Sequence, residues 1–312
     1  MDALRFLKTV VIMKIGANVE IERKRPGELL SMYLEQKAID YFQQGYGLSD
    51  LIRRMISPRD GDVSSRKAGS NMEFEQYRDY VPGDDPRGVD WKVYARSDRL
   101  FVRTYGRDVS ARVRIVLDTS ASMDFRQENG ESKFEIAKKL TALLAWLLRK
   151  ERHTVRFSLL SDDLRPFDAE GPESLETTLS STAASGVTDF AVLKPADSRE
   201  TGILITDGWG NDDGKGLRKV ADTGYHLFHL LTSREHSLRL TGDLLLRDIE
   251  TASELRVVPS SVRERYRMRI KEWLAFTGDA FRRQGSRHFF FPLEQNYYAT
   301  LMERLIHPEG GI

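Results

Sequence analysis

Five oxygen-bearing side chains in three separate segments of the chain could together bind a divalent metal ion. Asp118, Ser120 and Ser122 form an Asp-x-Ser-x-Ser pattern directly after an apolar run, and Thr188 and Asp207 follow further along. Hard cations such as Mg²⁺ bind oxygen ligands, and Mg²⁺ arranges six of them as an octahedron. Ser and Thr hydroxyls are neutral, so they leave the metal with positive charge that an incoming carboxylate can neutralise. The pattern favours a site that binds another protein's Asp or Glu over a bond-breaking centre.

The elements around these residues explain how the segments could meet. Residues 113–118 and 202–206 are predicted to be buried strands, with Asp118 and Asp207 at or just beyond their carboxyl ends. Thr188 lies just before a short helix expected to start near Asp189. In an open α/β sheet, ligands gather outside the carboxyl ends of the strands. We therefore expect both aspartates at one edge of the sheet.

Predicted strands and helices alternate from residue 113 onward, which implies an α/β fold with a mainly parallel central sheet and helices on both faces. The stretch 244–258 is expected to hold a short helix and then a strand. The other expected strands are 113–118, 154–160, 163–168, 202–206, 225–231 and 287–291. The other expected helices are about 131–151, 212–222, 261–283 and 294–306, and residues 172–185 are expected to form a Ser/Thr-rich helix or loop. We assign residues 111–312 to this domain.

Residues 1–110 are predicted to form an N-terminal extension, strand-like over 1–24, helical over 28–57 and a polar loop over 58–71. The apolar run near the start is cut short by Lys14, so it resembles a strand more than a signal peptide. No apolar stretch approaches the ~18 residues that span a bilayer. We therefore expect no transmembrane segment and a cytoplasmic protein.

The composition and the absence of certain motifs exclude several classes of function. The 312 residues are 40% hydrophobic and 30% charged, with a formal net charge of +1, which fits a globular protein and gives no overall attraction to nucleic acid. There are no cysteines, which excludes disulfides, thiolate metal sites and cysteine nucleophiles. The sequence contains no phosphate-binding Gly-x4-Gly-Lys-Ser/Thr loop and no Gly-x-Ser-x-Gly elbow, so an ATPase or serine hydrolase is not expected.

The five-residue pattern resembles the metal-ion-dependent adhesion site of the von Willebrand factor A domain family, and the resemblance covers about residues 110–300. It implies a Rossmann-like von Willebrand factor A domain. It also implies a divalent cation, with Mg²⁺ expected first and Mn²⁺ or Ca²⁺ as alternatives. The implied ligands act directly or, for the aspartates, through water: Asp118, Ser120, Ser122, Thr188 and Asp207.

A second segment, residues 69–96, resembles the signature of the bacterial domain-of-unknown-function family 58, whose members pair with MoxR-type AAA+ ATPases. The matching residues are Glu73, Phe74, Arg78, Tyr80, Gly83, Asp84, Asp85, Arg87, Asp90, Trp91, Ala95 and Arg96. Their alternating charges and aromatic side chains predict a partly buried ion-pair network, which either fixes the segment in place or docks a partner. The resemblance implies a non-enzymatic, chaperone-like adaptor that works with such an ATPase and a client protein.

Two alternatives remain open from the sequence. A metal-dependent hydrolase or phosphatase could use the same pocket, although no His or Glu is expected near any of the five positions and hydroxyl-rich coordination activates water poorly. A metal-free scaffold could use Asp-x-Ser-x-Ser only as a helix cap. Trp209, beside Asp207, is expected to be exposed on the rim of the site.

Overall fold

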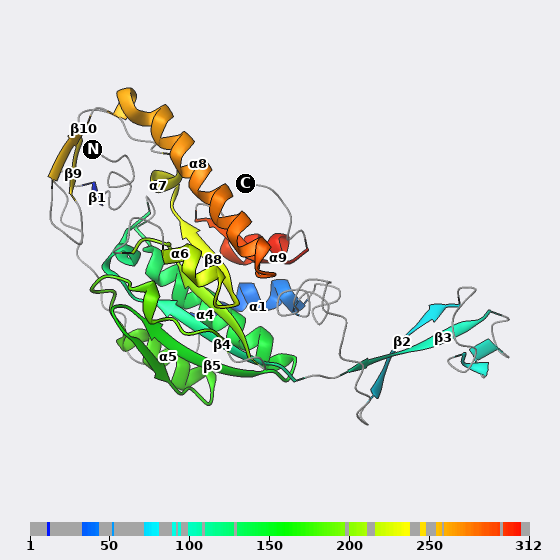
Figure 1. Ribbon diagram of the computed structural model, residues 1–312. Helices are drawn as coiled ribbons and strands as arrows, with labels where there is room; N and C mark the ends of the chain where they lie inside the picture. Colours follow the sequence, from blue (N-terminus) through cyan, green and yellow to red (C-terminus); the bar gives the residue numbers. More distant parts are fainter. Residues whose placement is uncertain are drawn as a thin grey trace. The chain divides into compact units, whose positions relative to one another are not determined.

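The computed structural model describes residues 11–12, 33–43, 52, 72–80, 89–91, 93–94, 99–107, 110–127, 130–196, 200–210, 216–237, 244–247, 254–257, 259–293 and 296–306. The chain divides into two compact units, residues 60–110 and residues 1–59 with 111–312 (Figure 1). Most of the predicted N-terminal strand and all of the loop over 58–71 lie outside the described residues. So do the ends of the helix predicted over 28–57.

Among the described residues of the larger unit, a six-stranded sheet has the order β11-β8-β7-β4-β5-β6. Its strands are β4 (Arg112–Asp118), β5 (Thr154–Leu160), β6 (Leu164–Phe167), β7 (Glu200–Thr206), β8 (Tyr225–Leu231) and β11 (His288–Pro292). Neighbouring strands are parallel except for the edge pair β5 and β6. From β4 the chain moves outward to β6 and then returns to build the other half from β7, which is doubly wound topology. The predicted fold class is confirmed, and the switch point of the sheet lies between β4 and β7.

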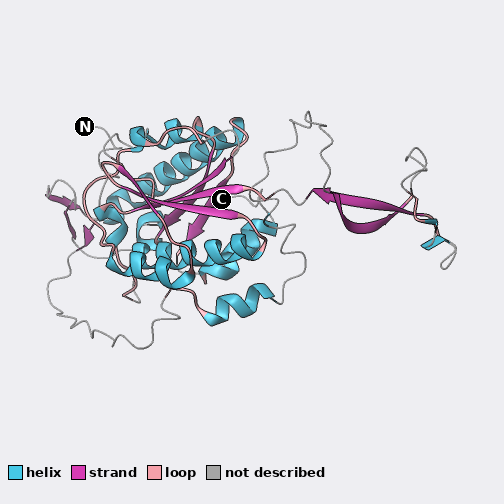
Figure 2. Cartoon of the chain, turned by 90° about the horizontal axis from the view of Figure 1, so that it is seen from below, coloured by secondary structure: helices cyan, strands magenta, loops and turns pink. Residues whose placement is uncertain are grey.

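Helices cover both faces of this sheet (Figure 2). One face carries α1 (Gln36–Gln43), α4 (Lys133–Lys150), α5 (Pro172–Ser181) and α9 (Tyr297–Ile306); the other carries α6 (Gly216–Ala221) and α8 (Pro259–Arg283). Alternate residues of β4 supply the two cores, because Ile115 and Leu117 point to the α4 side while Val116 points to the α8 side. Among the helices that the structure describes, none combines the length and apolar character needed to cross a bilayer.

The stretch 244–258 differs from its prediction. Within it the structure describes two strands, β9 (Leu244–Arg247) and β10 (Glu254–Val257), which pair antiparallel with each other. β9 also pairs with β1 (Val11–Ile12) from the N-terminal extension. The short helix expected at the start of this stretch is therefore wrong, because a four-residue apolar run has no periodicity that separates helix from strand.

The unit of residues 60–110 contains an antiparallel pair, β2 (Met72–Asp79) and β3 (Phe101–Arg107), with a bulge between Phe74 and Gln76. Between these strands Asp90 is buried, and it accepts a hydrogen bond from the backbone of Val93 at 3.3 Å. Trp91, which was expected to pack into an ion-pair network, is 60% exposed. Asp84, Asp85, Arg87, Ala95 and Arg96 of the predicted network and signature lie outside the described residues.

Candidate metal centre

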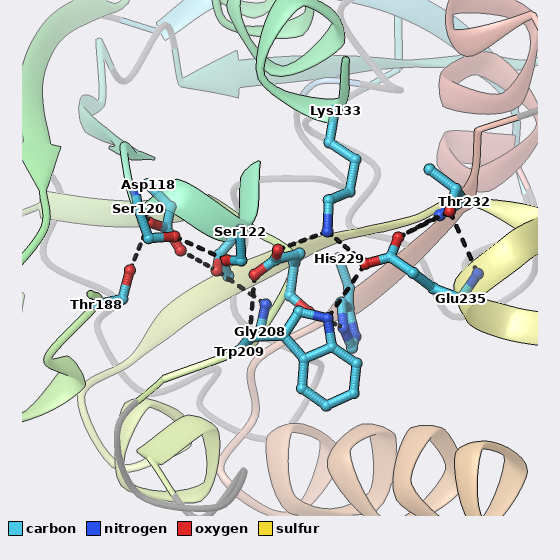
Figure 3. Close-up of polar contacts among 12 residues, drawn as sticks. Asp118, Ser120, Ser122, Lys133, Thr188, Gly208, Trp209, His229, Thr232 and Glu235 are labelled. Carbon is cyan, nitrogen blue, oxygen red and sulfur yellow. Dashed lines mark hydrogen bonds and ion pairs between the residues drawn. The ribbon is translucent and has the colours of Figure 1, made fainter. Parts of the chain in front are cut away.

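Asp118 is the last residue of β4, and its carboxylate accepts hydrogen bonds from several neighbouring residues (Figure 3). One carboxylate oxygen accepts from the backbone of Ser120 at 2.9 Å and from the hydroxyl of Thr188 at 2.5 Å. The other accepts from the hydroxyl of Thr206, the last residue of β7, at 2.5 Å. Residues 70 and 88 positions away in sequence thus meet one carboxylate.

The loop carrying Thr188 is held against the Asp118 loop by backbone hydrogen bonds. Ala121 donates to the carbonyl of Gly186 at 3.0 Å, and Ser185 donates to the carbonyl of Thr119 at 2.7 Å. Gly186 has φ 76°, in the left-handed region that glycine adopts without strain. These contacts place Thr188 by backbone geometry, not by its side chain alone.

Ser120 and Ser122 flank the start of the short 3₁₀ helix η4 (Ala121–Asp124). Their hydroxyl oxygens lie 3.0 Å apart, and both side chains are buried. That separation fits a hydrogen bond, and it also fits two adjacent ligands of an Mg²⁺ octahedron with Mg–O distances of about 2.1 Å. The two serines are spaced as neighbouring metal ligands would need to be.

Asp207 follows β7, on the other side of the switch point, and it is also fully buried. One carboxylate oxygen accepts from the backbone of Trp209 at 3.0 Å, and the other accepts from the ammonium of Lys133 at 2.6 Å. Burial and then the negative charge of Asp207 raise the pKa of Asp118 to about 6. The two carboxylates are therefore close enough to repel each other, which a bound cation would relieve.

Lys133 and Glu235 belong to this site although the sequence did not single them out. Besides Asp207, the ammonium of Lys133 contacts Glu235 Oε1 at 2.5 Å, and the lysine side chain is completely buried. Burial lowers the pKa of Lys133, but Asp207 and Glu235 outweigh it and hold that pKa above its usual value. The lysine is therefore charged. A signal existed for Glu235, because Thr232 and Glu235 have the spacing of a capping box.

His229 is a third residue of the site that the sequence analysis did not single out. Its Nε2 donates to the backbone carbonyl of Asp207 at 2.9 Å, which leaves Nδ1 to accept from Nε2 of His288 at 3.1 Å. Burial lowers the pKa of His229 to about 3, so the ring is neutral. A histidine and a glutamate do approach Asp207, contrary to the sequence argument, and both are engaged in hydrogen bonds.

Trp209 is buried, which corrects the expectation of an exposed rim residue. Its ring stacks on Trp273 of α8 with centroids 4.6 Å apart, and its indole N–H donates to Glu235 at 3.3 Å. The polar neighbours of Trp209 suggested an exposed loop, but the apolar face of α8 covers it. Trp209 therefore packs between the site and α8 and does not offer a surface to a ligand.

The donor set fits a divalent cation. Two carboxylates and three hydroxyls come from the ends of β4 and β7 and the loop before η5 (Phe190–Val192), which is the hard-oxygen chemistry that Mg²⁺ prefers. Ser120, Ser122, Thr188 and Asp118 are linked by hydrogen bonds, while Asp207 faces Lys133. Within the described residues no cluster of three or more His, Cys, Asp or Glu able to hold a metal is found.

Fold and site together define a doubly wound α/β protein with five oxygen-bearing side chains buried at the switch point of its sheet. The sequence profile of the family described as "Protein of unknown function DUF58" matches residues 76–274. The chain belongs to this family, as its signature segment predicted.

The chain is also similar to curated proteins and solved structures whose names state no activity. Uncharacterized proteins Rv1480 of Mycobacterium tuberculosis and Mb1516 of Mycobacterium bovis are each 40% identical over 65 residues, covering 21% of this chain and 20% of the relative. A von Willebrand factor type A structure from Catenulispora acidiphila has 16% identity and a TM-score of 0.26, covering 58% of this chain and 44% of that one. An uncharacterized membrane spanning protein from Vibrio fischeri has 14% identity and a TM-score of 0.20, covering 63% and 97%. At these scores neither structure adds to what the sheet topology shows.

Proposed function

We propose that this protein is a non-enzymatic, divalent-metal-dependent interaction module. Ser120, Ser122 and Thr188 would bind the metal directly, and Asp118 and Asp207 would bind it directly or through water. The observation that carries the proposal is the meeting of these side chains from three distant segments at the switch point of the sheet. When bound, the metal would supply a positive centre for an Asp or Glu of a partner protein.

The surroundings of the site support binding over bond breaking. Glu235 and His229, the acid–base groups that approach Asp207, are occupied by Lys133 and by a backbone carbonyl. A general base needs a lone pair within reach of the water that it activates. The buried setting also strengthens attraction between a metal and an entering carboxylate, because the effective dielectric constant is lower there than in water.

By its family resemblance, the partner we propose is a MoxR-type AAA+ ATPase, with the chain acting in the cytoplasm as a chaperone-like adaptor for a client protein. Mg²⁺ is the proposed cation, with Mn²⁺ and Ca²⁺ as substitutes. The partner assignment rests on the family resemblance, whereas the metal assignment rests on the donor set.

Calorimetric titration of the full chain with Mg²⁺ tests the metal site. We expect wild type to bind one ion and Ser120→Ala to bind at least tenfold more weakly, since a direct ligand is lost. Ser158→Ala is the matched control, because Ser158 is equally buried on β5 but outside the donor set. Absence of Mg²⁺ binding by wild type would support the metal-free scaffold, and equal binding by wild type and Ser120→Ala would contradict the assignment of Ser120 as a ligand.

A second assay separates adaptor from enzyme. We expect a MoxR-type ATPase to be retained by the immobilised wild-type chain in Mg²⁺, and to be lost in EDTA or with Asp118→Ala. Turnover of a generic phosphoester that disappears with Asp118→Ala would instead show the hydrolase alternative.

A further inference from the structure

Lys133 contradicts two general rules for lysine. Its side chain is fully buried, at 0% exposure, although lysine is almost never buried without a strong reason. It is also the first residue of α4, where the partial positive charge of the helix N-terminus disfavours a cation. Broken local rules in a natural protein mark positions where another requirement dominates.

The position of the ammonium is set by the starts of two helices. At α4, the hydroxyl of Ser132 accepts from the backbone of Glu135 at 3.2 Å, which fixes the first turn and with it Lys133. At α7 (Ser233–Ser237), one carboxylate oxygen of Glu235 accepts from the backbone and hydroxyl of Thr232, each at 2.9 Å. The other oxygen of Glu235 is thereby aimed at Lys133 (Figure 3). Neither charged group is a loose surface side chain.

We propose that Lys133 is a resident cation that neutralises Asp207 in the metal-free protein and weakens the site's hold on a divalent ion. The inference rests on the proposed function, since it concerns the same metal site. The ammonium of Lys133 donates to one oxygen of Asp207, and the backbone N–H of Trp209 donates to the other. Asp118, by contrast, has no cationic partner among the described contacts.

The consequence is a metal that is held loosely until a partner arrives. A positive charge next to a divalent ion raises the free energy of the bound state, and the effect is large where water is excluded. The same positive charge attracts the partner's carboxylate. Lys133 would therefore make metal and partner bind together, because each supplies the charge that the other lacks.

The rival interpretation is that Lys133 only holds Asp207 in place. The two interpretations predict opposite changes in Mg²⁺ affinity when Lys133 is removed. If Lys133 is a positioning residue alone, its removal loosens Asp207 and weakens metal binding. If Lys133 is a competing cation, its removal returns a full negative charge to Asp207 and strengthens metal binding.

The experiment compares Mg²⁺ binding by the full chain and three variants using calorimetry. We expect Lys133→Met, which keeps the length but not the charge, to bind about tenfold more tightly than wild type. We expect Glu235→Gln, which removes a nearby negative charge, to bind several-fold more weakly. Lys138→Met is the matched control and should bind as wild type does, since Lys138 is also buried on α4 but contacts Glu135 at 3.2 Å and the ring of Phe134.

Melting temperatures in EDTA give a second readout. Lys133→Met should melt below Lys138→Met, because Asp207 and Glu235 are left as buried charges without their cation. Added Mg²⁺ should raise the melting temperature of Lys133→Met more than that of wild type. Equal Mg²⁺ responses would overturn the inference.

Unchanged or weaker Mg²⁺ binding by Lys133→Met overturns the inference while leaving the metal site intact. If Lys133→Met does not fold, Glu235→Gln still tests the charge argument, and equal or tighter binding by that variant overturns the inference. Absence of Mg²⁺ binding by wild type and every variant overturns both the inference and the proposed function.

Discussion

At the scale of single residues, the two carboxylates of the site are not equivalent. Asp118 accepts hydrogen bonds from two hydroxyls and a backbone N–H, which are neutral, whereas Asp207 accepts one from the ammonium of Lys133. Both are fully buried. Without metal, Asp118 therefore carries a desolvation cost that its neighbours do not fully offset, and the pKa of Asp118 lies at about 6 for that reason.

This difference predicts opposite effects of two matched substitutions in EDTA at neutral pH. Asp207→Asn should lower the free energy of unfolding by about 3–5 kcal/mol, since it removes one partner of a buried ion pair. Asp118→Asn should be neutral or stabilising, because it removes a buried charge, keeps one oxygen as the acceptor for Ser120 and Thr188, and presents an amide N–H that the hydroxyl oxygen of Thr206 can accept. Urea denaturation measures both, and equal losses would contradict the distinction.

His226 gives a residue-scale prediction for pH. Its Nδ1 accepts from the backbone of Arg287 at 3.0 Å, and burial, followed by the charge of Arg287, lowers the pKa of His226 to about 4. The unfolded histidine titrates near 6.5, so the unfolded state binds the proton first as pH falls. Stability from this group is complete above pH 6.5 and is lost as pH falls toward 4.

The variant His226→Asn keeps an acceptor but does not titrate. Between pH 7 and pH 5, wild type should lose about 2 kcal/mol more unfolding free energy than His226→Asn does. Urea denaturation at the two pH values measures the difference, and the effects of His229 and Asp118 cancel because both proteins contain them. Parallel losses would show that His226 is not a buried neutral group.

At the scale of elements, the turn after β7 requires glycine at position 208. Gly208 has φ 76°, and a Cβ atom there would lie 2.5 Å from a side-chain carbon of Leu217 on α6. This turn places Asp207 and Trp209, so its geometry matters to the site. Alanine would add left-handed backbone strain of about 1–2 kcal/mol and an overpacking cost of about 1–3 kcal/mol.

We therefore expect Gly208→Ala to lower the free energy of unfolding by about 2–5 kcal/mol and to weaken Mg²⁺ binding. Gly224→Ala is the control, because Gly224 has a similar φ of 79° with no atom within 4 Å of an added Cβ. It should show the backbone cost alone, with Mg²⁺ binding unchanged. Thermal or urea denaturation compares the two, and equal losses would contradict the packing argument.

Helices and strands with a clear hydrophobic periodicity could be predicted from the sequence, and those too short to show one could not. The helix predicted over 261–283 is α8, since a long helix shows its apolar stripe over many turns. β9 was missed because four residues show no such period. Ser120 and Thr188, two residues of the motif, hydrogen-bond to Asp118, whereas the contact of Thr206 with Asp118 was not predicted.

The contacts of Lys133 could not be predicted in the same way. Lys133 reaches Asp207 across 74 positions and Glu235 across 102 positions in the sequence. No local pattern encodes such a pair, because it depends on how α4 and α7 are placed over the ends of different strands. A lysine directly after a helix-capping serine was the available sign, since a cation there opposes the helix dipole.

At the scale of the whole molecule, the site exists only because the sheet is doubly wound. β4 and β7 are neighbours although β5, β6, α4 and α5 separate them in sequence. Three loops therefore meet at one edge: residues 118–122, 182–189 and 206–209. A metal bound there would join segments that are otherwise linked by hydrogen bonds such as that from Thr188 to Asp118.

This arrangement predicts where Mg²⁺ slows amide hydrogen exchange. Opening of any one of the three loops would break metal ligands, so each should gain protection by a factor that grows with free Mg²⁺ concentration. The strands β9 and β10 and the β2–β3 pair carry none of the donors, so their exchange should not change. Asp118→Ala in the same buffers should show no Mg²⁺ effect in any loop. Protection of a single loop, or equal protection throughout the chain, would contradict a metal held jointly by all three.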